Sequence, residues 1–482
     1  MATQKHIHFI GIGGIGMSAL ARLLMDQGQT VSGCDLHESS ITRELAQRGA
    51  TIALGHSSAH LRNAEMVVIT AAVRPDNPEV QHAHAQGIPV IKRAELLGRL
   101  MAGKRGIAVA GTHGKTTTAS LIAWTLVRVG LDPTVLVGGE VPELGGNALS
   151  GRGAWLVAEA DEFDASFLTL QPEIAVVTNI EAEHLDFYKD LAGVVAAFQQ
   201  FLQQIPAAGH IVFCLDDPVL AGLESTQDMA HKRDQRELSR GEVLLPGVFQ
   251  TQSMVSYGLH AAARWRAERL RPNPLGGTDF LCLHNGAPYA EFSLRIPGRH
   301  NVSNALAVVA TCHLLGVAPN VLKDALASFG GVKRRFQVLG EAKGVTVIDD
   351  YAHHPTEVRA TLAAARQRYQ GRPIYCLFQP HTYSRTKLLM ALYTDAFQDA
   401  DSVCITEIYP AREEDVWGVS GADLAQALRH PQVTFTPTLE EAASLLLKTL
   451  RAGDVLLVMG AGDVYTVGES VLRELRKASD VL

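Results

Sequence analysis

The sequence of 482 residues predicts an α/β protein of three domains, each built on a mainly parallel sheet. Short apolar segments alternate with helical patterns along the chain, which is typical of doubly wound sheets. Two glycine-rich loops, 11–16 and 111–114, each follow an apolar segment and precede a helical pattern. A chain of this length also exceeds what one hydrophobic core normally serves.

The expected domain boundaries lie near residues 100 and 325, which gives domains 1–100, 101–324 and 325–482. Within the second domain, the stretch of about 225–295 is richer in Gly, Arg and Pro and predicts a β-rich insertion with long loops. The strands that we expect are 6–10, 30–33, 51–54, 66–69, 88–91, 106–110, 154–159, 174–178, 345–348, 373–378, 403–406 and 455–459. Helices are expected at 17–27 and 119–128, directly after the two glycine loops.

Composition narrows the class of protein. With 47% hydrophobic and 19% charged residues the chain is globular, and its net charge of −7 gives no reason to expect nucleic acid as a partner. No apolar run approaches the ~20 residues of a membrane span, and no signal-peptide pattern begins the chain. The six cysteines are scattered without a C-x-x-C pair, which favours buried thiols in a reducing cytoplasm.

The second glycine loop carries the clearest chemistry. It reads Gly111-Thr112-His113-Gly114-Lys115-Thr116-Thr117-Thr118 and follows the expected strand 106–110. Backbone N–H groups at such a turn point at an anion, and the helix dipole favours negative charge there. Lys115 would reach the β- and γ-phosphates, and the Thr116 hydroxyl would bind Mg²⁺. Position 109 is Val, where the standard pattern has Gly, so this is a shorter variant; a structural turn without ligand is the alternative.

The first glycine loop, Gly11-Ile12-Gly13-Gly14-Ile15-Gly16, has the dinucleotide spacing, with Asp35 at the end of the next expected strand. The pattern suits NAD, FAD or any diphosphate ligand, UDP-sugars included. A tight turn without ligand is the remaining interpretation.

Polar residues follow several of the expected strands, where open α/β sheets bind ligands. Glu159 ends one strand beside the Lys115 loop and is a candidate Mg²⁺ ligand. His184, after another strand, is either a second metal ligand or part of a charged surface turn. The third domain offers the segments 349–355 and 379–386. Adjacent histidines in the first of these do not favour zinc, because no Cys or third His stands at ligand spacing.

Taken together, these motifs resemble those of the Mur ligases, the ATP-dependent amino-acid-adding enzymes of peptidoglycan synthesis, over essentially the whole chain. Within that family the likeness is greatest to the alanine-adding branch, and a sister branch that recycles the murein tripeptide shares much of the framework. Later Mur enzymes carry a lysine, downstream of the His184 motif, that becomes carbamylated; residues 191–204 contain no lysine, in agreement with the alanine-adding branch. The motifs that carry the resemblance are G-I-G-G-I-G-M-S, G-T-H-G-K-T-T-T, E-A-D-E-F-D-A-S-F-L, T-N-I-E-A-E-H-L-D, P-G-R-H-N-V-S-N-A, D-D-Y-A-H-H-P-T-E and F-Q-P-H-T-Y-S-R-T.

The resemblance implies an N-terminal Rossmann-like domain for UDP-N-acetylmuramate, a central P-loop domain for ATP, and a C-terminal Rossmann-like domain for L-alanine. The lactyl carboxylate would attack the γ-phosphate of ATP to give an acyl phosphate, which the amine of alanine then attacks. Closure of the domains would bring the substrates together. The implied cofactors are ATP and Mg²⁺, the location is cytoplasmic, and the assembly is a monomer or homodimer.

The resemblance also assigns residues, four sets in all. The UDP-sugar set is Gly13, Gly14, Ile15, Asp35 and His56. The ATP set is Gly111, Thr112, His113, Gly114, Lys115, Thr116, Thr117, Asn301, Asn304, Arg335 and Asp350. The metal set is Thr116, Glu159 and His184. The amino-acid set is Tyr351, His353, His381 and Arg385. The expected catalytic group is drawn from these sets and consists of Lys115, Glu159, His184, Arg335, His353, His381 and Arg385.

Some alternatives stay open at this point. His353 or His381 would orient alanine or help to take its proton, with a purely hydrogen-bonding role equally open, and the sequence does not decide which of His353 and His354 faces the site. A nicotinamide dehydrogenase would explain the first glycine loop but leaves the Lys115 loop and Glu159 without a purpose. A regulatory P-loop ATPase would leave the third domain's histidines and Arg385 unexplained.

Overall fold

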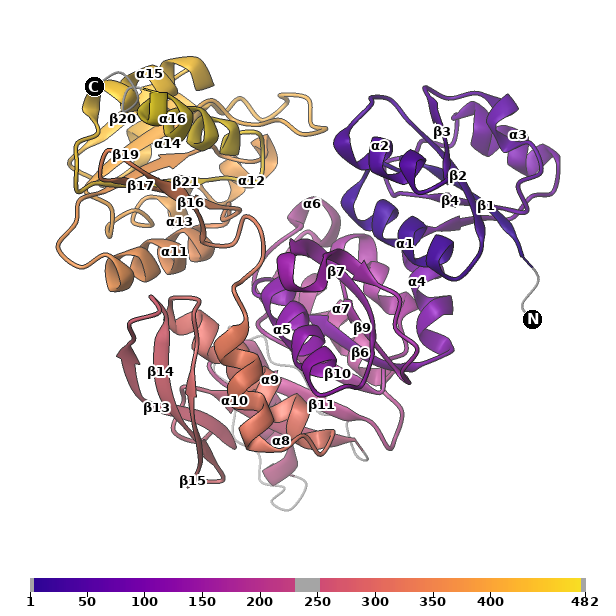
Figure 1. Ribbon diagram of the computed structural model, residues 1–482, viewed down its shortest axis with the longest axis horizontal. Helices are drawn as coiled ribbons and strands as arrows, with labels where there is room; N and C mark the ends of the chain where they lie inside the picture. Colours follow the sequence, from indigo (N-terminus) through magenta and orange to yellow (C-terminus); the bar gives the residue numbers. More distant parts are fainter. Residues whose placement is uncertain (1–3, 230–251, 478–482) are drawn as a thin grey trace. The chain divides into compact units, whose positions relative to one another are not determined.

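A computed structural model describes residues 4–229 and 252–477. Its contacts define two compact units: Met1–Ala267 with Cys282–Ala290 and Ser303–Ala325, and Glu268–Leu281 with Glu291–Val302 and Leu326–Leu482. Three sheets are present in the described residues, and most of their strand pairs are parallel (Figure 1). The predicted α/β class is therefore confirmed, while the domain boundaries at 100 and 325 stay predictions.

The first sheet has five parallel strands in the order β3-β2-β1-β4-β5. Because the chain order reverses between β1 and β4, the loop after β1 opens at a topological switch point, where such sheets bind ligands. The first glycine loop occupies that position. The elements are β1 (His6–Ile10), α1 (Ile15–Asp26), β2 (Thr30–Asp35), α2 (Ser40–Gln47), β3 (Thr51–Leu54), η1 (Ser58–Leu61), β4 (Met66–Ile69), α3 (Pro78–Ala85), β5 (Val90–Lys92) and α4 (Arg93–Ala102).

The second sheet has ten strands in the order β15-β14-β13-β12-β11-β10-β6-β9-β7-β8. Strand β6 lies between β10 and β9, parallel to both, and it leads into the second glycine loop. The elements are β6 (Arg105–Ala110), α5 (Lys115–Arg128), β7 (Thr134–Val141), η2 (Pro142–Leu144), β8 (Gly146–Leu149), β9 (Trp155–Glu159), η3 (Phe163–Thr169), β10 (Ile174–Val177), α6 (Leu185–Tyr188), α7 (Leu191–Gln203), β11 (His210–Cys214), α8 (Pro218–Met229), β12 (Ser253–Gly258), β13 (Trp265–Pro272), β14 (Thr278–His284), β15 (Ala287–Ser293), α9 (Arg299–Leu314) and α10 (Pro319–Ser328). The expected β-rich stretch thus contains β12 to β15, while its segment 230–251 lies outside the described residues.

The third sheet has six strands in the order β16-β17-β21-β18-β19-β20, of which β16 alone runs antiparallel to its neighbour. The elements are β16 (Gln337–Ala342), β17 (Val345–Asp350), α11 (Pro355–Arg368), β18 (Ile374–Phe378), α12 (Tyr383–Leu388), α13 (Met390–Tyr393), β19 (Ser402–Thr406), α14 (Gly421–Ala427), β20 (Val433–Thr436), α15 (Leu439–Thr449), β21 (Val455–Met459) and α16 (Tyr465–Lys477).

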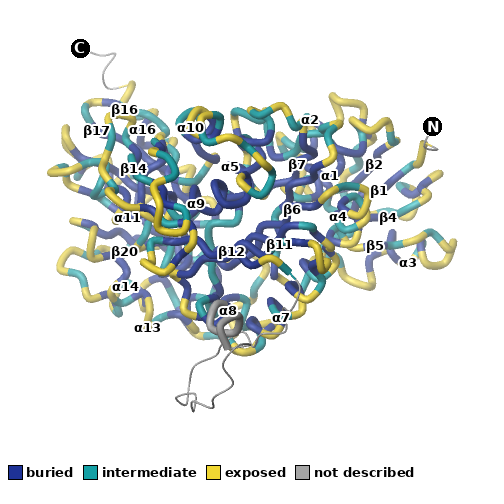
Figure 2. Tube along the Cα trace, turned by 90° about the horizontal axis from the view of Figure 1, so that it is seen from below, coloured by how far each residue is buried: buried dark blue, intermediate teal, exposed yellow. Residues whose placement is uncertain are grey.

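The central strands are apolar because neighbours and helices cover them. Every residue of β21 is buried, as are residues 106–110 of β6. Figure 2 shows this burial as dark blue tube along β6, β11 and β12. The expected strands differ from the observed ones by at most two residues at either end, as for the strand expected at 88–91, which lies at 90–92. The helix expected at 17–27 lies at 15–26, and the helix expected at 119–128 begins at Lys115. The earlier start of α5 follows from Gly114, whose left-handed backbone makes it the N-cap.

Candidate functional site

The second glycine loop is shaped by two glycines with positive φ. Gly111 has a φ of +130° and Gly114 a φ of +79°. A Cβ on Gly111 would lie 2.0 Å from Thr178 Oγ1, and a Cβ on Gly114 would lie 2.8 Å from Asn304 Oδ1. Only glycine fits such positions without a shift of the neighbours. The turn therefore directs the start of α5 toward the loop, the arrangement that binds phosphates.

Residues after the neighbouring strand β10 hold this loop in place. The N–H of His113 donates to Asn179 Oδ1 at 2.8 Å, and its carbonyl accepts the Thr178 hydroxyl at 2.6 Å. The Thr112 N–H donates to the Asn179 carbonyl at 3.0 Å. The backbone of the predicted ATP loop is thus fixed by its neighbouring strand end.

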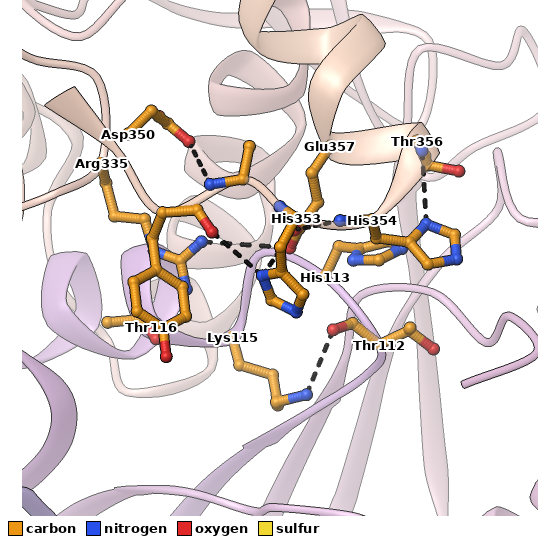
Figure 3. Close-up of polar contacts among 12 residues, drawn as sticks. Thr112, His113, Lys115, Thr116, Arg335, Asp350, His353, His354, Thr356 and Glu357 are labelled. Atoms are coloured by element: carbon orange, nitrogen blue, oxygen red, sulfur yellow. Dashed lines mark hydrogen bonds and ion pairs between the residues drawn. The ribbon is translucent and has the colours of Figure 1, made fainter. Parts of the chain in front are cut away.

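Lys115 is paired with a buried carboxylate. Its Nζ lies 2.8 and 2.9 Å from the two oxygens of Glu162 and donates to the Thr112 carbonyl at 3.2 Å, the contact drawn in Figure 3. Burial lowers the pKa of Lys115, but the carboxylates of Glu162, Asp161 and Glu159 outweigh it and raise that pKa above its ordinary value. Lys115 is therefore a protonated, preoriented cation at the loop.

Thr116 and Glu159 form an oxygen pair at the same loop. The Thr116 hydroxyl donates to Glu159 Oε2 at 3.1 Å, and the other Glu159 oxygen accepts the N–H of Gly138. A hydroxyl and a carboxylate beside a phosphate loop are hard oxygen donors, which Mg²⁺ prefers. The two predicted ligands are brought together and fit that ion.

His184 lies at the N-cap of α6 with a φ of +53°. Its ring packs edge-on against Phe163, with 5.0 Å between the ring centroids, and its charge acts on Glu162. The structure places it beside the partner of Lys115. Its role as a metal ligand stays a prediction.

Asn301 and Asn304 follow one another by one turn of α9, and both are buried. Asn301 Nδ2 donates to the Pro297 carbonyl at 2.7 Å. Asn304 lies against the Gly114 turn, as the Cβ geometry above shows. This position beside the loop suits a contact with a nucleotide, which stays a prediction for both residues.

The first glycine loop is held by Asp35, one of its predicted partners. The Gly13 N–H donates to Asp35 Oδ2 at 2.9 Å, and the Gly14 N–H donates to the Gly11 carbonyl at 3.2 Å. We expected the N–H groups of Gly13, Gly14 and Ile15 to hold a diphosphate. In the structure the Gly13 N–H is hydrogen-bonded to Asp35, so this carboxylate stabilises the loop itself. Ile15 starts α1 and is 51% exposed.

His56 lies in the loop between β3 and η1, two residues after β3 ends, and its Nδ1 is 3.4 Å from Cys34 Sγ. Cys34 and Asp35 are the last two residues of β2. His56 is therefore close to the predicted UDP-sugar site, although its recorded contact is with a thiol.

The second unit gathers its predicted residues around the end of β17. Asp350 accepts the N–H groups of Ala352 and Phe336 at 2.7 and 2.6 Å. Burial raises the pKa of Asp350 to about 6, although the Arg335 guanidinium lowers it. Arg335 also lies over the Tyr351 ring, 5.1 Å from its centroid.

The two adjacent histidines have different positions. His354 is fully buried as the N-cap of α11, where its Nδ1 accepts the Thr356 N–H at 3.3 Å. His353 hydrogen-bonds the Tyr351 carbonyl through Nδ1 at 2.9 Å, and its ring meets that of His381 with centroids 5.7 Å apart. Both histidine contacts with the backbone are drawn in Figure 3. His353 is thus in contact with His381 of the predicted amino-acid set.

His381 and Arg385 form a pair at the start of α12. Arg385 Nη1 lies 2.7 Å from the His381 carbonyl and 2.9 Å from its Nδ1. The His381 ring stacks on Tyr409 with centroids 5.8 Å apart. The predicted amino-acid residues of this unit are therefore next to one another in space.

Three family models match successive parts of the chain. They are described as Mur ligase family, catalytic domain (6–105), Mur ligase middle domain (109–241) and Mur ligase, glutamate ligase domain (334–462). A protein from Geobacter sp. (strain M21), named UDP-N-acetylmuramate–L-alanine ligase, is 45% identical over 479 residues and covers 99% of both chains. The chain belongs to the Mur ligase family. The predicted resemblance is thereby confirmed.

Further Mur ligases agree in sequence and fold. A Myxococcus xanthus protein with the same name is 45% identical over 473 residues, 98% of this chain and 95% of that protein. The crystal structure of UDP-N-acetylmuramate-alanine ligase MurC from Thermotoga maritima has a TM-score of 0.79 at 30% identity, over 98% of this chain and 99% of that one. MurF from the same organism, in complex with ADP, has a TM-score of 0.61 at 16% identity, which shows the fold alone.

Membership of the Mur ligases sets aside the dehydrogenase and the regulatory ATPase. No helix within residues 4–229 and 252–477 is both long and apolar enough to cross a bilayer. All six cysteines are free and buried, as the scattered cysteines of the sequence predicted.

Sequence reasoning missed three carboxylates of this Mur ligase. Glu162 pairs with Lys115, Glu357 accepts the N–H groups of His353 and His354, and Glu413 accepts the Thr382 and Ser384 hydroxyls. Glu162 lies inside the quoted E-A-D-E motif and Glu357 at the end of D-D-Y-A-H-H-P-T-E. Their positions inside these motifs could have identified them as candidate site residues. For Glu413 the sequence offers no signal, because it lies far along the chain in a loop.

Proposed function

We propose that this chain joins L-alanine to the lactyl carboxylate of UDP-N-acetylmuramate, with ATP converted to ADP and phosphate, as a step of peptidoglycan synthesis. The observation that carries the proposal is the full-length similarity, at 45% identity, to relatives named for this reaction. The second glycine loop, with Lys115 and the Thr116–Glu159 pair, provides the cation and the oxygen ligands that binding of ATP with Mg²⁺ requires.

The first step joins two anions, the lactyl carboxylate and the γ-phosphate. A carboxylate oxygen attacks the γ-phosphorus, the bond to the bridging oxygen breaks, and ADP leaves with the electron pair. Lys115 offsets the negative charge on the transferred phosphoryl group, since the structure makes it a protonated cation at the loop. Arg335 is proposed to offset the same charge.

Mg²⁺ would be held by Thr116 and Glu159, with His184 as a further proposed ligand, and would neutralise phosphate charge when bound. The backbone N–H groups at the start of α5 and the turn from Gly111 to Thr117 would orient the phosphates. Asn301, Asn304 and Asp350 are proposed to contact the rest of ATP.

The second step is attack by the amine of alanine on the acyl phosphate carbon. The new C–N bond forms, the C–O bond to phosphate breaks, and the amine loses a proton. His353 and His381 are proposed to orient the amine or to accept that proton. Arg385 is proposed to pair with the alanine carboxylate, a planar fork-shaped contact that lysine would not match, with Tyr351 lining the same site.

The test is phosphate release with ATP and a panel of acceptors. We expect release to require both UDP-N-acetylmuramate and an amino acid, with L-alanine ahead of glycine and L-serine. The panel also includes the murein tripeptide as a substrate, because a murein peptide ligase from Psychrobacter arcticus resembles this chain with a TM-score of 0.69 at 25% identity. Turnover with the tripeptide and none with L-alanine would replace the proposal by the recycling reaction.

A further inference from the structure

A cluster of metal-ligating side chains lies under the first glycine loop, and of the site residues predicted above it includes His56. His8 on β1, Cys34 on β2 and Glu79 on α3 are all buried, and one ligand atom of each lies within 4.8 Å of the others. Cys34 Sγ is 3.0 Å and His8 Nε2 is 3.5 Å from Glu79 Oε2. Three residue types that bind transition metals thus meet at one buried point.

The His8 ring is held in the orientation that a metal ligand needs. Its side chain is fully buried, and its Nδ1 hydrogen-bonds Ser32 Oγ at 2.8 Å. A partner on one ring nitrogen fixes the orientation of the ring and aims the other nitrogen at a metal. The other nitrogen, Nε2, is buried and makes no hydrogen bond to any of the described residues. It points instead at the carboxylate of Glu79.

Two further histidines stand at the edge of the cluster. His56 Nδ1 is 3.4 Å from Cys34 Sγ and 3.9 Å from Glu79 Oε2, and it is only partly exposed. His60 Nδ1 contacts the other oxygen, Glu79 Oε1, at 2.6 Å and orients that carboxylate from outside. His56 is therefore the candidate for a fourth ligand, and His60 orients the Glu79 carboxylate.

We propose that His8 Nε2, Cys34 Sγ and Glu79 Oε2, with His56 Nδ1 in the fourth position, bind a zinc ion. Bonds of about 2.0 Å to nitrogen and oxygen and about 2.3 Å to sulfur place tetrahedral ligand atoms roughly 3.3–3.8 Å apart. The distances of 3.5 and 3.4 Å agree with that spacing. The 3.9 Å between His56 Nδ1 and Glu79 Oε2 must shorten and the 3.0 Å between Cys34 Sγ and Glu79 Oε2 must lengthen, each through a small side-chain rotation. On binding, the Cys34 thiol releases its proton to solvent and the metal–sulfur bond replaces the thiol's hydrogen bond to Glu79.

The donor set determines the class of metal. Thiolate and imidazole select zinc and related transition ions, while Mg²⁺ prefers oxygen ligands and keeps its waters. The site is thus chemically distinct from the Thr116–Glu159 pair, and it does not depend on the proposed ligase reaction. The rival account is a hydrogen-bonded hub without metal, in which Glu79 simply accepts from Cys34, His60 and the Ser57 N–H.

The experiment uses the full-length protein, stripped with chelator and kept in excess Mg²⁺ so that oxygen-ligand sites are filled. Cobalt(II) is titrated in as a spectroscopic stand-in for zinc. We expect a thiolate-to-cobalt charge-transfer band in the near ultraviolet that saturates at one ion per chain and is abolished by competing zinc. Cys34→Ser should lose the band, and His8→Gln should weaken cobalt binding at least about tenfold, as loss of one ligand implies. Cys312→Ser, which removes a buried thiol in α9, is the matched control and should keep the band.

A second measurement needs no variant and so stands even if Cys34→Ser fails to fold. Zinc X-ray absorption of the loaded parent protein should show one sulfur at about 2.3 Å together with nitrogen and oxygen ligands. A first shell without sulfur, or a cobalt band that survives in folded Cys34→Ser, would overturn the proposal in favour of the hydrogen-bonded hub. Phosphate-release activity plays no part in either readout, so failure here is separate from failure of the proposed function.

Discussion

Lys115 Nζ lies 2.8 Å from Glu162 Oε2, and the Glu162 carboxylate is almost completely buried. The loop cation of this Mur ligase therefore has an anionic partner of its own before any phosphate arrives. Glu162 keeps Lys115 charged inside the protein, and it also holds the ammonium close to the Gly111–Thr112 backbone.

The first prediction concerns Lys115. Lys115→Ala should lower kcat by on the order of 10²–10³, the usual cost of losing one contact to charge that develops in the transition state. Phosphate release at saturating substrates measures this. Lys323→Ala, an exposed lysine of α10, should behave like the parent. A folded Lys115→Ala protein with nearly parental kcat would remove Lys115 from the mechanism.

The second prediction concerns the pH dependence that Glu162 imposes. Since Glu162 raises the pKa of Lys115, Glu162→Gln should lower it, and the alkaline limb of kcat should move to lower pH. The measurement is kcat against pH for both proteins. Glu173→Gln, which breaks a surface pair with Arg105, should leave the limb in place. Superimposable alkaline limbs for Glu162→Gln and the parent would show that Lys115 does not titrate in the rate-limiting step.

The third prediction concerns magnesium. Glu159→Gln should raise the Mg²⁺ concentration needed for half-maximal rate and lower kcat, because an amide is a weaker ligand than a carboxylate for a hard cation. His184→Ala should do the same more mildly. Mg²⁺ titrations of the rate provide the measurement, with exposed Glu440→Gln as the control. If both curves overlie that of the parent, these residues have structural roles and the ion is held elsewhere.

The fourth prediction concerns the first glycine loop. Gly14 has a φ of −66°, and a Cβ there meets no atom closer than 3.5 Å, so Gly14→Val should fold. Its side chain would crowd a diphosphate at the loop, and we expect the KM for UDP-N-acetylmuramate to rise about tenfold or more, or about 1.4 kcal/mol, with little change for ATP. Gly103→Val, at another glycine with negative φ and space around it, is the matched control.

Titration calorimetry completes that test on the full-length chain. UDP-N-acetylmuramate should bind the parent and bind Gly14→Val more weakly. Micromolar binding of NADH with no affinity for the UDP-sugar would contradict the assignment of this loop.

The fifth prediction concerns Asp350 and stability. Its pKa is about 6 in the fold and 3.8 ordinarily, so the folded state binds the proton more tightly than the unfolded chain. The stabilisation is therefore complete below pH 3.8 and is lost as pH rises through 6, an effect of about 3 kcal/mol at 1.36 kcal/mol per pKa unit. Asp350→Asn cannot titrate, so its loss of stability relative to the parent should be largest near pH 4 and shrink by pH 7. Calorimetric unfolding across this range, with exposed Asp399→Asn as control, measures the difference; a constant gap would show that Asp350 titrates normally.

The strands and the two loops could be predicted because their signals are local. An apolar run that ends in glycine, followed by a helical pattern, identified β1 and β6 with bounds close to those observed. The start of α5 was harder, because Gly114 becomes a helix cap only through its left-handed backbone. The strand expected at 88–91 begins only at Val90, after Pro89, which has no backbone N–H to donate to a neighbouring strand.

The partners of the site residues could not be predicted in the same way. Glu159, Asp161 and Glu162 follow one another closely, and only the backbone beyond β9 decides that Glu162 turns toward Lys115. His353 and His354 are neighbours of the same type, and the capping of α11 by His354 separates their roles. Glu79 belongs to the first turn of an ordinary-looking helix, and nothing local indicates that it meets His8 and Cys34.

The end of β2 sets a limit on how this chain can change. Side chains alternate between the two faces of a strand, and here Cys34 turns to Glu79 while Asp35 turns to the Gly13 N–H. A single-residue insertion or deletion within 30–35 would exchange the two faces and put the carboxylate among buried histidines. The length of this strand therefore cannot vary without the loss of both contacts.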